Sequence, residues 1–108
     1  MSLKTSVRYV LITCILLGGG IATAAEVELR QKNKAFSKTE ITIKAGDTVK
    51  FPNDDPFFHN IFSLSETQMF DLGSYPQGES REVTFSTPGV VEVECAIHPQ
   101  MRANIVIE

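Results

Sequence analysis

Residues 90–101 read VVEVECAIHPQM, a strand pattern that runs directly into a short loop. Val91, Val93 and Cys95 share one parity and alternate with glutamates, which predicts a strand with one apolar face and one wet face. Cys95 is the last residue of the apolar row. Its thiol is therefore expected to face the interior, at the point where the chain leaves the strand.

The loop after this strand carries two further side chains that bind metals. His98 and Met101 follow Cys95 at two-residue gaps, and Pro99 stiffens the backbone between them. Such spacing lets a tight loop gather three donors around one ion. His59, the other histidine of the chain, begins a different strand, so a fourth donor would come from a distant part of the sequence.

The four donors suit copper. Two imidazoles and a thiolate with a weak thioether accommodate both Cu(I) and Cu(II), because the set mixes soft and borderline ligands. Zinc is the other metal to consider, but structural zinc prefers several thiolates or a hard fourth ligand, so Met101 favours copper. Taken singly, each residue also has a structural interpretation, with Cys95 and Met101 as ordinary core and the histidines on the surface.

The first 24 residues are predicted to be a signal peptide. Lys4 and Arg8 precede a short apolar run, and residues 22–24 form an Ala-x-Ala cleavage site. The run is shorter than the ~20 residues that a spanning helix needs, and glycines interrupt it. We expect cleavage after residue 24 or 25, export to the periplasm and no remaining membrane span. A retained anchor and a lipoprotein modified at Cys14 are the alternatives.

The remaining domain, residues 25–108, is small and acidic. The signal peptide contains two of the ten basic residues and none of the thirteen acidic ones, which leaves 8 − 13 = −5 with neutral histidines. This charge disfavours nucleic-acid binding, which depends on basic side chains meeting phosphates. Export favours disulfides, but after processing Cys95 has no partner in the chain. A bound metal would explain the unpaired thiol and would stabilise a small core.

The whole domain is predicted to consist of strands separated by Gly, Pro and Asn turns, because no segment shows a sustained helical period. The predicted strands lie at residues 27–29, 41–43, 48–51, 59–63, 81–85, 90–95 and 104–108. Residues 64–78 carry turn signals and are predicted to form a long irregular connection. The pattern indicates an all-β, antiparallel sandwich.

These features resemble the cupredoxins, or type 1 blue copper proteins of the amicyanin and plastocyanin type. The loop at residues 95–101 is most similar to the short amicyanin loop, and residues 43–54 and 59–61 are similar to the family's strand, turn and first-ligand regions. The resemblance covers nearly the whole of residues 25–108, which it identifies as one cupredoxin domain. It implies a cupredoxin-like Greek-key β-sandwich of about eight strands, with copper near one end.

The resemblance also implies roles for single residues. His59, Cys95 and His98 correspond to the equatorial ligands of one copper ion, and Met101 to the axial ligand. Asn60 matches an asparagine whose side chain hydrogen-bonds to the loop that bears the cysteine, a contact that would hold the ligands in place.

The chain also departs from the family pattern. Phe58 and Ile97 precede the two histidines where proline is common. Residues 69–75 are unlike those of amicyanin and resemble a subgroup of exported plastocyanin-like proteins of the methylamine-utilisation type.

The expected function is one-electron transfer in the periplasm by copper that alternates between Cu(II) and Cu(I). His98 would be the exit for the electron, within an apolar rim that includes Phe57, Ile97 and Pro99. We expect a monomer that meets redox proteins of the dehydrogenase or cytochrome type in small, brief contacts.

Catalysis finds no support in the sequence. The carboxylates are scattered over strand faces and turns, and both histidines are already assigned to the metal, so no catalytic residue is predicted. A periplasmic copper carrier or buffer without an electron-transfer role is the alternative function. A metal-free interaction module with a buried Cys95 is a third.

Overall fold

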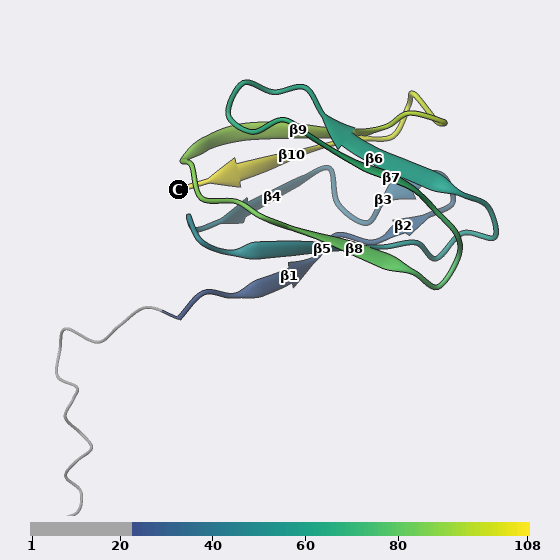
Figure 1. Ribbon diagram of the computed structural model, residues 1–108, viewed down its shortest axis with the longest axis horizontal. Helices are drawn as coiled ribbons and strands as arrows, with labels where there is room; N and C mark the ends of the chain where they lie inside the picture. Colours follow the sequence, from purple (N-terminus) through teal and green to yellow (C-terminus); the bar gives the residue numbers. More distant parts are fainter. Residues whose placement is uncertain (1–22) are drawn as a thin grey trace, which may run out of the picture.

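The chain forms ten strands in the computed structural model, which describes residues 23–108 (Figure 1). Buried and exposed side chains alternate along several of these strands. In chain order the strands are β1 (Glu26–Glu28), β2 (Gln31–Lys32), β3 (Ala35–Phe36), β4 (Glu40–Ile43), β5 (Thr48–Pro52), β6 (His59–Ser63), β7 (Phe70–Tyr75), β8 (Ser80–Thr84), β9 (Gly89–Cys95) and β10 (Arg102–Ile107). Most of the predicted signal peptide, residues 1–22, lies outside the described residues. In the described part of the chain, no helix has the length and apolar character that crossing a membrane requires.

The strands form two main sheets and one hairpin. One sheet has the order β1-β5-β8, the other has the order β4-β10-β9-β6-β7, and β2 pairs with β3. The predicted all-β class is confirmed, and eight of the ten strands remain when the two-residue strands β2 and β3 are set aside. The expectation of a purely antiparallel arrangement was wrong. β1 lies parallel to β5, and β4 lies parallel to β10, because long connections separate the members of each pair.

The prediction of an irregular connection over residues 64–78 was also wrong. This stretch contains β7, which pairs with β6 and ends at the fully buried Tyr75. A register shift between Asn60 and Phe62 and a left-handed Gly73 (φ 73°) interrupt the ladder. Both irregularities disturb the strict alternation of side chains, and for that reason the sequence pattern concealed the strand.

The core lies between the two main sheets and is made of aliphatic and aromatic side chains from both. Its fully buried members include Leu29, Val49, Phe51, Ile61, Tyr75, Phe85, Val91, Val93 and Ile105. The loop from β9 to β10 lies at the end of the sandwich opposite the C-terminus (Figure 1). Because β9 is paired on both sides, by β10 and β6, the residues at its end have a firmly held backbone.

Candidate metal centre

Three of the four predicted ligands meet at this end of the sandwich. His59 opens β6, Cys95 closes β9, and His98 lies in the loop that follows. Their ligand atoms all lie within 4.8 Å of one another. His59 and Cys95 come from neighbouring strands of one sheet, since Ile61 of β6 pairs with Cys95 of β9. Sheet pairing therefore brings together donors that are 36 residues apart in the sequence.

The spacing of these atoms fits a metal ion. Nδ1 of His59 lies 3.5 Å from the Cys95 Sγ, and Nδ1 of His98 lies 3.8 Å from the same sulfur. Metal bonds of about 2.0 Å to nitrogen and about 2.3 Å to sulfur, meeting at about 120°, would place nitrogen and sulfur about 3.7 Å apart. Both nitrogen–sulfur distances are thus close to those expected for two imidazoles and a thiolate around one ion.

Cys95 points inward, as the alternation along β9 predicted. Val91, Val93 and Cys95 are buried, whereas the intervening glutamates are less so, and Cys95 is 2% exposed. It is a free cysteine. The backbone N–H of Asn60 donates to its Sγ at 3.5 Å.

A tight turn connects the third predicted ligand to the fourth. The N–H of Met101 donates to the carbonyl oxygen of His98 at 2.9 Å, and Pro99 occupies the second position of this turn, where its ring suits the required φ. Met101 is 1% exposed and directly precedes β10. The thioether therefore belongs to the interior beneath the loop.

Three apolar residues lie next to His98. The Phe57 ring lies 5.3 Å from the His98 ring and 5.4 Å from the His59 ring, centroid to centroid. Ile97 is 48% exposed, and Pro99 is also exposed. The three residues of the predicted rim thus flank a histidine that is itself half-buried.

Asn60 does not make the contact that the resemblance implied. Its side-chain Nδ2 donates to Asp71 Oδ1 at 2.8 Å, on the outer side of the sheet. The link to the cysteine segment is made by the backbone instead, because Ala96 N–H donates to the Asn60 carbonyl at 2.9 Å. The reason is strand alternation: His59 and Ile61 face inward, so the residue between them must face outward.

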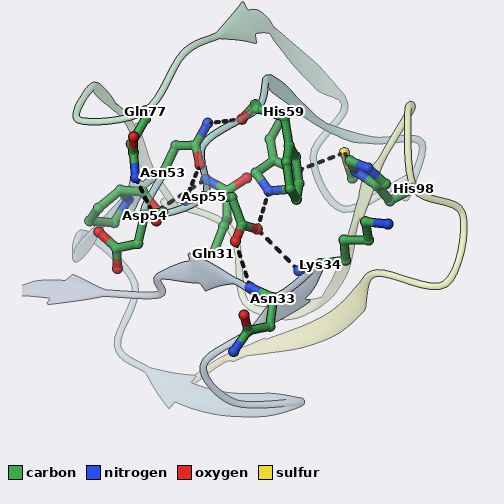
Figure 2. A network of polar contacts seen from close by, with 12 residues as sticks. Gln31, Asn33, Lys34, Asn53, Asp54, Asp55, His59, Gln77 and His98 are labelled. Atoms are coloured by element: carbon green, nitrogen blue, oxygen red, sulfur yellow. Dashed lines mark hydrogen bonds and ion pairs between the residues drawn. The ribbon is translucent and has the colours of Figure 1, made fainter.

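Asp55 is a residue of the site that the sequence did not single out. Its Oδ2 lies 2.8 Å from Nε2 of His59, and both side chains are almost completely buried (Figure 2). The carboxylate also accepts hydrogen bonds from the backbone N–H groups of Asn33 (2.6 Å) and Lys34 (3.0 Å). The only sequence signal was its place four residues before His59, and Asp54 beside it pairs instead with Arg30.

Local surroundings shift the pKa values of two groups at the site. Burial alone would raise the pKa of Asp55, but hydrogen bonds from His59 and from the backbone of Lys34 and Asn33 lower it below its usual range. Partial burial, the neighbouring His59 and the ammonium of Lys34 lower the pKa of His98. Asp55 is therefore a carboxylate, and His98 a neutral imidazole able to bind a metal, at neutral pH.

Comparison with known proteins agrees with this donor set. The profile of the copper binding proteins of the plastocyanin/azurin family matches residues 23–108. Amicyanin-alpha of Methylorubrum extorquens is 29% identical over 90 residues, which cover 81% of this chain and 76% of that protein. Amicyanin of Paracoccus versutus is 29% identical over 72 residues, which cover 64% of this chain and 54% of that protein.

Solved structures show the same fold. The crystal structure of amicyanin from Paracoccus versutus superposes with a TM-score of 0.70 at 26% identity, covering 82% of this chain and 85% of that chain. The copper-containing nitrite reductase from Thermus scotoductus gives a TM-score of 0.73 at 25% identity. The match covers 86% of this chain but only 25% of the nitrite reductase chain.

Proposed function

Because the chain belongs to the plastocyanin/azurin family of copper-binding proteins, we propose that it is a periplasmic electron carrier with one type 1 copper ion. The cofactor and the family are those that the sequence predicted. The chain is a small, amicyanin-like copper protein of a carrier family and not an enzyme. The cluster of His59, Cys95 and His98 at one end of the sandwich is the single observation that carries the proposal.

In this proposal His59, Cys95 and His98 are the equatorial ligands and Met101 the weak axial ligand. The copper supplies one-electron chemistry by alternating between Cu(II) and Cu(I). The protein supplies a rigid cage, because the paired strands β6 and β9 hold two ligands and the Pro99 turn holds the loop. Rigid ligands suit electron transfer, since little structure has to rearrange when the oxidation state changes.

Electron exchange is proposed to occur through His98. His59 and Cys95 are buried, whereas His98 is half-buried and is surrounded by Phe57 and by the exposed Ile97. A redox partner that covers this apolar surface would exclude water and approach the imidazole edge. Partners of the dehydrogenase or cytochrome type, brief contacts, a monomeric state and cleavage of the signal peptide are further parts of the proposal.

The test is a titration of the purified domain, residues 25–108, with Cu(II). One equivalent is expected to produce an intense blue thiolate-to-copper absorption that bleaches with a mild reductant and returns on oxidation. Cyclic voltammetry should show a single reversible couple. Copper that binds without this band, or that leaves the protein on reduction, would instead support the copper carrier or buffer.

A further inference from the structure

The Asp55 carboxylate connects a proposed copper ligand to a hairpin turn. Figure 2 shows Asp55 between His59 on one side and Asn33 and Lys34 on the other. Both oxygens are used: Oδ1 accepts from Asn33, and Oδ2 accepts from Lys34 and lies beside His59. A buried charge without partners is costly, so a buried carboxylate needs hydrogen-bond partners, and Asp55 has three.

The turn is shaped for this anion. Asn33 (φ 58°) and Lys34 (φ 57°) join β2 to β3 and both have left-handed backbones, which side chains other than glycine rarely adopt. In this conformation their consecutive N–H groups point at one carboxylate. The two-residue hairpin thus presents an anion-binding concavity to Asp55.

The backbone of Asp55 is held as firmly as its side chain. Its N–H donates to Asn53 Oδ1 at 2.8 Å. The Asn53 Nδ2 in turn donates to the carbonyl oxygens of Phe57 and Tyr75, at 2.9 and 3.0 Å. Asn53 is fully buried, so the loop that carries Asp55 is fastened to β7 from inside the domain.

We propose that Asp55, clamped by the Asn33–Lys34 turn, is a positioning residue that orients His59 and lowers the reduction potential of the copper site. The proposal rests on the proposed function. Donation from Nε2–H to a carboxylate sets the tautomer of His59, leaves Nδ1 free to face Cys95 and makes that nitrogen a stronger donor. A stronger imidazole donor favours Cu(II) over Cu(I).

The first test replaces Asp55 with asparagine. An amide has one acceptor oxygen for three donors, and its NH₂ group opposes the N–H groups of the turn. In Asp55→Asn the reduction potential is expected to rise, and the affinity for Cu(II) to fall about 10- to 100-fold. The matched control is Asp54→Asn, which removes the neighbouring carboxylate that pairs with Arg30 and should leave both values near those of the parent.

The second test changes the turn and leaves Asp55 in place. Lys34→Gly and Lys34→Val both remove the ammonium that lies 5.7 Å from the Phe57 ring centre, so their electrostatic effects match. Glycine adopts the left-handed backbone readily, whereas β-branched valine does not. The valine variant is therefore expected to have a higher reduction potential and weaker Cu(II) binding than the glycine variant. Equal potentials in these two variants would overturn the role of the turn.

A readout without copper separates this inference from the proposed function. In the metal-free parent, NMR should show a slowly exchanging Nε2–H on the His59 ring, and in Asp55→Ala that proton should exchange rapidly. If the parent shows no blue band, the proposed function fails while the ring signal still reports on the contact. If the band is present but Asp55→Asn has the potential of the parent, the inference fails and the function stands.

Discussion

The substitution Tyr75→Phe tests how much the buried hydrogen bonds of the Tyr75 hydroxyl stabilise the domain around the metal site. The Tyr75 hydroxyl is fully buried, donates to the Phe51 carbonyl at 2.8 Å and accepts from Gln31 Nε2 at 2.8 Å. Burial raises the pKa of Tyr75 to about 12, so the hydroxyl keeps its proton at neutral pH. The residue also pairs with His59 across β6 and β7, which makes it part of the frame of the metal site.

The expected cost follows from what the substitution leaves behind. Two hydrogen bonds are lost, each with a net contribution of about 0.5–1.5 kcal/mol. No partner is orphaned, however, because Gln31 Nε2 still lies 3.2 Å from the carbonyl oxygens of Phe51 and Pro52. We therefore expect each bond to contribute at the lower end of this range, so that Tyr75→Phe lowers the free energy of unfolding by about 1 kcal/mol in total. For a domain of this size, such a loss lowers Tm by about 4–8 °C.

The assay is thermal unfolding of the copper-free protein, followed by circular dichroism, with the copper-loaded spectrum measured in parallel. Thr42→Val is the control, since it removes an exposed hydroxyl from β4 and should change stability by less than about 0.5 kcal/mol. The Tyr75→Phe protein should still form the blue copper band. A Tm equal to that of the parent would refute the reasoning, because the buried hydroxyl would then contribute nothing.

Three further outcomes are expected. Cys95→Ser should keep the fold, as judged by circular dichroism, but lose the intense absorption, and retention of that band would rule out thiolate ligation. Met101→Gln should still bind copper with a lower reduction potential in voltammetry, because a harder donor favours Cu(II); failure to bind copper would contradict an axial role. Hydrogen bonds from the N–H groups of Ala25 and Lys44 lower the pKa of Asp47, so the stability it contributes is present above about pH 4 and is lost as pH falls through the folded pKa. Melting curves from pH 5 to pH 2 should thus fall less steeply for Asp47→Asn than for the parent.

The metal-binding loop could be predicted because its signals are local. The alternation of Val91, Val93 and Cys95 sets which way the thiol faces, and the structure shows that direction. Pro99 marks the turn that follows, and the hydrogen bond from Met101 to His98 closes it. The ligand roles remain proposals, but the donors were identifiable because few other residues of these types occur in the chain.

The side-chain contacts around the proposed ligands could not be predicted in this way. Asp54 and Asp55 are indistinguishable neighbours in the sequence, yet one pairs with Arg30 at the surface and the other lies beside His59 in the interior. Asn60 likewise bonds to Asp71 rather than toward the cysteine loop. Asp54 and Asn60 bond to partners that lie 24 and 11 residues away. Asp55 lies only four residues from His59, but the turn whose N–H groups receive its carboxylate lies 21 to 22 residues away.

The sequence alone therefore determined the all-β class, the inward thiol and the loop that carries the donors, because strand alternation and turn chemistry act between residues that are near in the chain. The tertiary structure decided the parallel pairs, the strand β7 and the clamp of Asp55 by the Asn33–Lys34 turn. The parallel pairs and the clamp of Asp55 join residues 21 to 64 positions apart, and no local sequence pattern determines which of several long-range pairings is the most stable. For that reason the metal donors could be predicted from the sequence, whereas the contact between Asp55 and His59 could be identified only in the folded domain.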